Sequence, residues 1–403
     1  MQVEGQRRLG SGALILLIII LCFFPPLSTD MFLSDMPNMA VELHTDASTM
    51  NMVLYGCMLS LAVSILVFGP VTDRYGRRPV LFFALVEYIV VSLIGSVVDN
   101  IYVLVVIRVL QGIGSGAAMT VSTALIKDCF TGPRMQKVLS ISAVMGVLAP
   151  LVAPILGAWI ISISSWRWTL VAPTILGAIC LVMTFALTET VSDEKRATAS
   201  VKANFRAIGV ILSDKAFTAF LFIATALNGA FMAYLSVSSY IYEESFGCSS
   251  MVYSLYLAAA LILGTLFMFV VNRVWSIVGN VKAIGIYVGL ALFSGVIMYL
   301  FGGVSDLVFL LTFLPCVTAT SAIRPFGMGI IMGSRDGDNG LVSALINFMM
   351  FAFGVIGMVV STMFPDYIKG LATLMFVFSA IYIAAWLCLR HMGYEKLRGL
   401  KLQ

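Results

Sequence analysis

Charged side chains are scarce in this chain of 403 residues. Lysine and arginine number 24 and aspartate and glutamate 20, so 24 + 20 = 44 residues, or 11%, carry charge. A soluble domain has roughly 25% charged residues, whereas here 60% of the residues are hydrophobic. So little charge cannot cover a water-facing surface of ordinary size. The composition therefore excludes soluble domains, a disordered chain and a coiled coil, and it predicts a helical membrane protein.

The sequence also lacks the usual residues of metal sites, disulfide frameworks and enzymes. Its 7 cysteines are scattered singly without a CxxC pair, and its 2 histidines, His44 and His391, lie far apart. A disulfide scaffold or a thiolate metal site is not expected from this pattern. The chain has no GxxxxGK[ST], HExxH or GxSxG motif, so ATP hydrolysis and hydrolytic catalysis are not expected either. We expect no metal, no cofactor and no enzyme activity.

What is present is a series of long apolar runs separated by short polar breaks. A membrane-spanning helix needs roughly 20 apolar residues. The runs predict an all-α integral membrane protein with twelve spans, at 12–36, 49–68, 79–98, 101–127, 137–163, 168–188, 216–242, 251–272, 281–303, 307–333, 340–364 and 370–390. The first run follows Arg7 and Arg8 and could be read as a signal peptide. It continues beyond Pro26 without a small-x-small cleavage site, so we interpret it as a retained span.

One break is longer and more polar than the others. Residues 189–215 contain eight charged side chains from Asp193 to Lys215, and six predicted spans lie on each side. We expect an N-terminal half at 1–188, a cytoplasmic linker at 189–215 and a C-terminal half at 216–403. Two similar halves joined by a charged linker are typical of secondary transporters with duplicated repeats.

The basic residues predict how the spans are oriented. With both termini inside, two basic residues, Arg167 and Lys369, fall outside, and two, Arg108 and Arg324, fall within spans. The other twenty lie on the cytoplasmic side: Arg7, Arg8, Arg74, Arg77, Arg78, Lys127, Arg134, Lys137, Lys195, Arg196, Lys202, Arg206, Lys215, Arg273, Lys282, Arg335, Arg390, Lys396, Arg398 and Lys401. This bias predicts cytoplasmic termini. A nucleic-acid-binding patch is not expected, because the charges are spread over separate segments.

The loop after the second predicted span reads GPVTDRYGRRP at 69–79. It resembles the major facilitator signature G-x-x-x-D-R-x-G-R-R. The resemblance implies a conformational latch, with the arginines bridging to acids or helix ends of the other half and holding the cytoplasmic side closed in one state. The alternative is a positively charged inner loop without that role. The latch residues are Gly69, Asp73, Arg74, Gly76, Arg77 and Arg78.

Two spans carry further resemblances to that superfamily. RVLQGIG at 108–114 resembles its R-x-x-x-G-x-G motif, and a buried Arg108 is costly enough to need a cavity and an acid. The segment 146–157 resembles the antiporter signature G-x-x-x-G-P-x-x-G-G, although Ala149 and Ala153 replace glycines. In the family this motif marks exporters. The residues that we assign to it are Gly146, Pro150, Pro154 and Gly157. Ordinary helix packing is the alternative for both segments.

The first span contains TDMFLSDMP at 29–37, which resembles a stretch of the Bcr/CflA drug-resistance subfamily. Asp30 is the expected proton carrier, with Arg108 as its partner and Glu87 in the third span as a second buried acid. Asp35 is expected to be a solvated charge at the helix end. Glu87, Asp30 and Arg108 form the predicted proton-coupling set.

The expected substrate-binding residues come from both halves. They are Asp30, Arg108, Gln111, Asn228, Tyr234 and Arg324. Tyr234 lies in a stretch that resembles the same subfamily. Arg324 stands alone in an apolar span, and it either binds an anionic or polar substrate or pairs with an acid such as Asp30 or Glu87.

These features predict a major facilitator fold and a proton-coupled antiporter of the inner membrane. It would export small amphipathic molecules or drugs by alternating access, as a monomer whose partners are its substrate, protons and the lipid bilayer. A dedicated exporter of one metabolite, such as an amino acid or a siderophore, is the alternative within this class. A membrane enzyme or receptor is the alternative outside it.

Overall fold

The computed structural model describes residues 9–192, 196, 201–333 and 339–392. Within these ranges the regular structure is helical and no strand occurs. Twelve of the helical segments are long and apolar enough to cross a membrane, which confirms the predicted fold class. The chain packs as two compact units, Met1–Asn204 and Phe205–Gln403, and each contains six of these segments.

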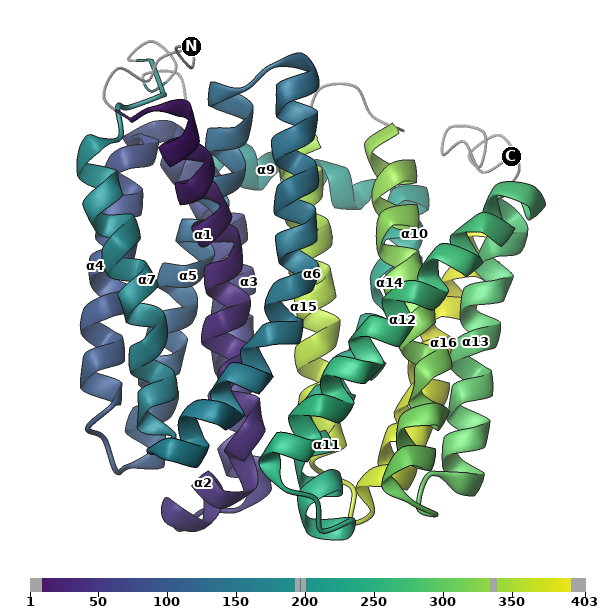
Figure 1. Ribbon diagram of the computed structural model, residues 1–403. Coiled ribbons are helices and arrows are strands. Elements are labelled where there is room, and N and C mark those ends of the chain that lie inside the picture. Colours follow the sequence, from purple (N-terminus) through teal and green to yellow (C-terminus); the bar gives the residue numbers. More distant parts are fainter. Residues whose placement is uncertain (1–8, 193–195, 197–200, 334–338, 393–403) are drawn as a thin grey trace. The chain divides into compact units, whose positions relative to one another are not determined.

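The first unit is a bundle of long helices joined by short turns (Figure 1). Asp46 and Asn100 cap the helices that follow them, because their side chains accept hydrogen bonds from Ser48 N and Tyr102 N, respectively. The helical segments are α1 (Ser11–Asp30), η1 (Met31–Asp35), α2 (Met36–Glu42), α3 (Ala47–Tyr75), α4 (Arg77–Gly95), α5 (Ile101–Cys129), α6 (Gly132–Ile163) and α7 (Arg167–Ala186).

The second unit contains another six spans. Its first span is assembled from α10, α11 and the π-helical turn η2, which follow one another closely. The segments are α10 (Lys215–Thr225), α11 (Asn228–Tyr240), η2 (Ile241–Ser245), α12 (Ser250–Val278), α13 (Asn280–Phe301), α14 (Asp306–Gly333), α15 (Asn339–Ser361) and α16 (Tyr367–His391). Helix α9 (Val201–Ser213) lies within the predicted linker.

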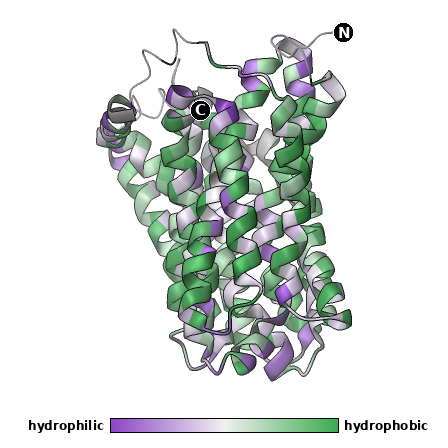
Figure 2. Ribbon diagram, turned by 90° about the vertical axis from the view of Figure 1, so that its left-hand side faces the viewer, coloured by the Kyte–Doolittle hydropathy of each residue, from purple (hydrophilic) through white to green (hydrophobic). Residues whose placement is uncertain are grey.

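Large apolar side chains point away from the core on many helices, including Phe83, Trp159 and Phe269. In Figure 2 hydrophobic residues dominate the length of the helices, and hydrophilic residues gather toward the ends. A soluble protein rarely exposes apolar patches on this scale. The outward-facing apolar surface is therefore the surface that contacts lipid.

The first span is not one continuous helix. Its α-helix ends at Asp30, residues Met31–Asp35 form a 3-10 turn, and α2 completes the span. Our expectation for Asp35 was wrong: it is buried, with 6% relative exposure, and its Oδ1 accepts a hydrogen bond of 2.7 Å from Asn38 Nδ2. The 3-10 turn has about 3.0 residues per turn instead of about 3.6, so Asp35 points in a different direction from the one that a continuous α-helix would give it.

Candidate functional site

A buried arginine is the centre of the polar site in the first unit. Arg108 of α5 has 0% relative exposure. Its Nη1 donates to the backbone oxygen of Ser28 at 2.9 Å and to Gln111 Oε1 at 3.0 Å. Its guanidinium carbon lies 5.0 Å from the centre of the Phe32 ring, a cation–π distance. The helix α1 and the 3-10 turn that follows it thus both contact the cation.

Helix α4 supplies a second set of contacts around this arginine. Gln111 Nε2 donates to Ser92 Oγ at 2.6 Å, and Tyr88 OH donates to Ser28 Oγ at 2.7 Å. Tyr88, Ser28 and Ser92 are all buried. The network therefore ties α1, α4 and α5 together and fixes the position of Arg108. Gln111 was predicted from the sequence, but the other three residues were not, because an isolated serine or tyrosine in an apolar run forms no recognisable motif.

One edge of the Arg108 guanidinium is unused. Its Nε and Nη2 are buried and have no hydrogen-bond partner in the described part of the chain. These two N–H groups point in the same direction and make the edge that binds a carboxylate through two parallel hydrogen bonds. Leaving these buried donors unpaired costs free energy. This edge can therefore donate hydrogen bonds to an anionic or polar oxygen group of a ligand.

Asp30 lies beside this network, at the last residue of α1. It has 7% relative exposure, and its Oδ1 accepts a hydrogen bond of 2.8 Å from Thr29 Oγ1. The carboxyl group interacts electrostatically with Arg108, but no ion pair joins the two within 4.0 Å among the described contacts. The structure therefore brings the expected acid and its arginine into one neighbourhood and leaves them without a direct bond.

Helix α6 packs on the 3-10 turn through the residues assigned to the antiporter motif. Ser34 Oγ donates to the backbone oxygen of Pro154 at 2.7 Å. A methyl group added at Gly157 would lie 2.1 Å from the backbone oxygen of Met31, so the two backbones touch because residue 157 has no side chain. Ala153, which replaces a family glycine, is fully buried against Met31 and Leu27.

The other two residues of that motif do not share this close contact. Pro150 is an interior residue of α6, like Pro154. A methyl group at Gly146 would meet nothing within 4 Å. Only the later part of the motif therefore makes the tight contact with the segment that follows Asp30.

Glu87 lies elsewhere in the first unit, at the contact between α4 and α5. Both carboxyl oxygens are buried and have no hydrogen-bond partner among the described residues. A methyl group at Gly114 would lie 2.2 Å from Glu87 Oε2, so the carboxyl group fills the space that this glycine leaves.

The predicted binding residues of the second unit have different surroundings. Asn228 donates from Nδ2 to the backbone oxygen of Met350 at 2.8 Å and so joins α11 to α15. Tyr234 is fully buried and stacks on Phe313 with ring centres 3.7 Å apart. Arg324 has an exposed side chain, and no ion pair of it occurs within the described part of its unit. The internal contacts of this unit thus occupy Asn228 and Tyr234 but leave Arg324 available.

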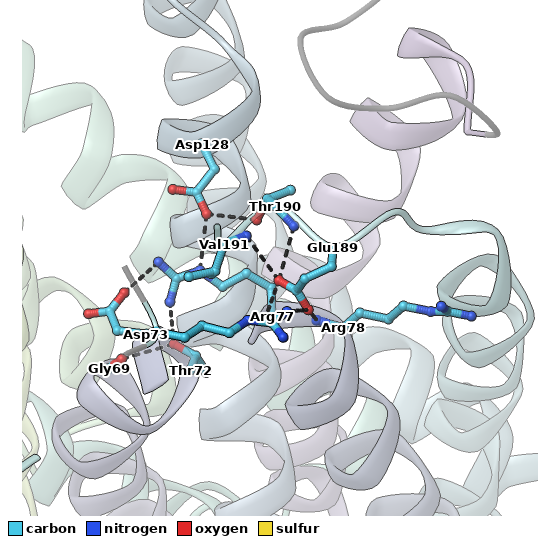
Figure 3. Close-up of polar contacts among 10 residues, drawn as sticks. Gly69, Thr72, Asp73, Arg77, Arg78, Asp128, Glu189, Thr190 and Val191 are labelled. Carbon is cyan, nitrogen blue, oxygen red and sulfur yellow. Dashed lines mark hydrogen bonds and ion pairs between the residues drawn. The ribbon is translucent and has the colours of Figure 1, made fainter. Parts of the chain in front are cut away.

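The residues of the predicted latch form a closed network inside the first unit (Figure 3). Arg77 is buried, and its guanidinium pairs with Asp73 at 2.6 Å and with Asp128 of α5 at 3.0 Å. Its Nη1 also donates to Thr72 Oγ1 at 2.6 Å. Arg74, by contrast, is exposed. The contacts described for Arg77 lie within its own unit, and the expected bridges to the other half stay a prediction.

Glu189, just after α7, completes this network by capping α4. Its carboxylate accepts hydrogen bonds from Arg77 N at 2.9 Å and from Arg78 N at 3.1 Å, as Figure 3 shows. Gly76 makes this geometry possible, because its φ of 99° is a conformation that side-chain-bearing residues rarely adopt. Thr190 Oγ1 adds a hydrogen bond of 2.8 Å to Asp128. Sequence reasoning missed Asp128 and Glu189, whose roles depend on contacts far apart in the chain.

The remaining latch residues make weaker contributions to the network. Gly69 offers only its backbone oxygen, which accepts from Thr72 Oγ1 at 2.9 Å. Arg78 is exposed and donates to the backbone oxygens of Thr184 and Phe185 at the end of α7, at 3.2 and 3.0 Å.

Comparisons with known proteins agree with this architecture. The family model described as Major Facilitator Superfamily matches residues 16–358. The chain is 32% identical over 254 residues to the MFS-type transporter YdgK of Bacillus subtilis, with 62% of each chain covered. It is 25% identical over 234 residues to a bicyclomycin resistance protein homolog of Haemophilus influenzae, with 58% of this chain and 59% of the relative covered. The matches thus span about three fifths of the length of these relatives.

Solved structures show the same fold. A POT family transporter in complex with 5-aminolevulinic acid superposes with a TM-score of 0.74 at 14% identity, with 96% of this chain and 99% of that chain covered. A D-xylose-proton symporter superposes with a TM-score of 0.69 at 14% identity, with 93% and 96% covered. With twelve apolar helices in two six-span units and a family match over most of its length, the chain belongs to the Major Facilitator Superfamily.

Proposed function

We propose that this protein is a proton-coupled exporter of small amphipathic molecules, working by alternating access. The observation that supports this most is the buried pair of opposite charges in the first unit, Asp30 and Arg108. Ionisable groups in the middle of a membrane span are costly and mark ion or substrate pathways. Here the arginine is held by three helices, keeps a free hydrogen-bonding edge and has an acid nearby.

The acid provides the coupling. An ionised Asp30 can hold a cationic or hydrogen-bond-donating group of a substrate whose oxygen group lies on the free edge of Arg108, whereas protonation neutralises the carboxylate and weakens that interaction. Substrate and proton would then bind in alternation, as antiport requires. One charge moved across 100 mV supplies about 2.3 kcal/mol, which sustains roughly a 50-fold gradient per proton. Asp30 carries the proton, and Arg108 and Gln111 hold the substrate group.

Several features support export rather than import. The segment 146–157 resembles a motif of antiporters, and its contact with the turn after Asp30 connects it physically to the coupling residue. Two relatives are named a bicyclomycin resistance protein homolog and the multidrug resistance protein MdtL of Citrobacter koseri, the latter at 28% identity. We further propose an inner-membrane location, cytoplasmic termini and a monomer.

Arg324 favours a second candidate, a dedicated exporter of one anionic or zwitterionic metabolite. An exposed arginine within an apolar span, without an ion pair among the described residues of its unit, would attract a carboxylate and repel a lipophilic cation. The two candidates differ in breadth. A drug exporter transports several unrelated compounds, whereas a metabolite exporter transports one and is inhibited by its close analogues only.

Purified protein in proteoliposomes with an imposed pH gradient tests the proposal. The probes would be bicyclomycin, chloramphenicol and ethidium for a drug exporter, and a set of amino acids for a metabolite exporter. We expect pH-driven flux of at least one probe, and we expect Asp30→Asn to abolish this flux while the protein remains folded. Normal pH-driven flux by the Asp30→Asn variant would contradict the role of Asp30.

A further inference from the structure

Glu87 is a buried acid that the Asp30–Arg108 site does not use. It lies ten residues after Arg77 on α4, which is about 15 Å along the helix and far from either helix end. Both of its carboxyl oxygens are buried and unpartnered among the described residues. An ionised carboxylate in such surroundings would lack both water and hydrogen-bond donors, at a cost of several kcal/mol. The neutral, protonated acid fits this position.

No positive charge compensates Glu87 from the helices that pack against α4. Arg108 is the only charged residue away from a helix end on α3, α5 and α7, and it is directed to Ser28 and Gln111. Cys180 of α7 packs in the apolar cluster that also contains Leu81 and Leu85 of α4, and Tyr88 follows Glu87 in the sequence, so both titratable groups are neutral. The remaining charged groups on these helices lie near their ends: Asp73, Arg74, Arg77, Arg78, Lys127, Asp128 and Arg167.

The position of Glu87 relative to Arg108 is defined by α5. The carboxyl group contacts Gly114, which lies six residues beyond Arg108, or about 9 Å farther along α5, toward the helix end that carries the latch contact Asp128. Glu87 also adjoins Tyr88, which donates to Ser28 next to the site of Asp30. The first unit therefore contains two buried acids at different depths. Asp30 lies beside Arg108, whereas Glu87 has no cation beside it.

We propose that Glu87 is a second proton-binding site of the transport cycle, so that the protein moves two protons for each substrate molecule. This inference rests on the proposed proton-coupled export. In the conformation described here Glu87 is protonated, and its carboxyl group packs against Gly114. In the state that opens this layer to cytoplasmic water, the O–H bond breaks, the proton passes to water and the carboxylate becomes hydrated. Asp30 binds the other proton.

The number of protons per substrate is measured in proteoliposomes by finding the substrate ratio at which net flux stops. The membrane potential is clamped at zero with valinomycin and equal potassium, and a difference of one pH unit is imposed. Two protons balance about a 100-fold substrate ratio, and one proton balances about a 10-fold ratio, since each proton contributes 1.36 kcal/mol per pH unit. The probe is whichever of bicyclomycin, chloramphenicol or ethidium the wild-type protein transports.

We expect Glu87→Gln to lower the balance ratio tenfold, because the amide resembles the protonated acid but cannot release a proton. Glu244→Gln replaces an exposed acid and serves as the matched control, with an unchanged ratio expected. An unchanged ratio in Glu87→Gln would overturn the proposal and assign Glu87 a packing role. Absence of any pH-driven flux in the wild type would instead overturn the proposed function, so the two failures are distinguishable.

A second measurement does not depend on the folding of a variant. Dicyclohexylcarbodiimide modifies protonated carboxyl groups in apolar surroundings, and mass spectrometry locates the modified residue. In the wild-type protein we expect modification of Glu87 that declines as the pH rises. Glu244, which is exposed, should remain unmodified under the same conditions. A Glu87 that never reacts, at any pH at which the protein is folded, would show that it does not hold a proton.

Discussion

Some close contacts in the first unit are possible only because a residue has no side chain, and Gly157 is the clearest case. A methyl group there would come within 2.1 Å of the backbone oxygen of Met31, whereas a methyl group at Gly146 of the same helix would meet nothing within 4 Å. Replacing each glycine by alanine therefore distinguishes the effect of helix propensity from the effect of a close backbone contact.

We expect Gly157→Ala to lower the free energy of unfolding by about 1–3 kcal/mol, the usual effect of overpacking. Gly146→Ala should leave it unchanged or raise it by up to about 1 kcal/mol, because alanine favours the helix more than glycine does. Thermal unfolding of both variants in the same detergent measures the difference. Equal melting temperatures would show that α6 does not contact the 3-10 turn as described.

The free edge of Arg108 is the second feature at this scale. Arg108→Lys keeps the positive charge but removes the planar fork, which a lysine cannot reproduce. We expect the lysine variant to fold and to lose at least tenfold in pH-driven transport, since one lost charge-assisted hydrogen bond is worth about 1.5–3 kcal/mol. Transport at the wild-type rate would show that charge alone is sufficient at this position.

At this scale the sequence pointed to residues whose type is rare in its surroundings, and their roles stay predictions. Asp30, Arg108 and Glu87 stand out because charges are unusual in apolar runs. Tyr88 and Ser92 were missed because hydroxyl groups are common in membrane helices, and only the fold shows which of them bond to the residues that hold the arginine.

At the scale of whole elements, the latch joins the end of α3, the start of α4, the end of α5 and the segment after α7. Arg77 connects three of these through Asp73, Asp128 and Thr72. Glu189 connects the fourth by capping α4. Because Arg77 is buried, removing it would leave Asp128 with one fewer partner in a protected position.

We expect Arg77→Ala to destabilise the protein by about 3 kcal/mol, as is usual when one partner of a buried ion pair is lost. Arg74→Ala, which truncates the exposed arginine of the same motif, should change stability by less than about 0.5 kcal/mol. Chemical unfolding in detergent compares the two variants. If both variants were as stable as the wild type, the loop would act only as a topology signal.

The element boundaries were largely predictable, because hydropathy marks the spans and glycine, proline, asparagine and aspartate mark the turns. Two features were not. The 3-10 turn at Met31–Asp35 occurs within an apolar run whose hydropathy does not change, and it depends on the contact with Pro154 and Gly157. Helix α9 occurs in a segment whose charges suggested a loop, although its burial of Ile208 and Ile211 follows a helical spacing.

At the scale of the whole molecule, the family assignment explains why polar residues are concentrated in a few places. Each unit has an apolar exterior and a small number of buried ionisable or hydroxyl groups. In a chain with 11% charged residues, burying a charge that makes no ion pair costs free energy, and packing alone does not offset this cost. The proton-coupled transport that we propose would explain why Asp30 and Glu87 are present.

Coupling between proton and substrate is the central claim, and the substrate ratio at zero net flux in proteoliposomes tests it most directly. With one pH unit imposed and no membrane potential, the account predicts that wild-type protein balances about a 100-fold substrate ratio, and that Glu87→Gln balances about a 10-fold ratio. A balance at equal substrate concentrations, whatever the pH difference, would contradict it, because flux would then be independent of protons.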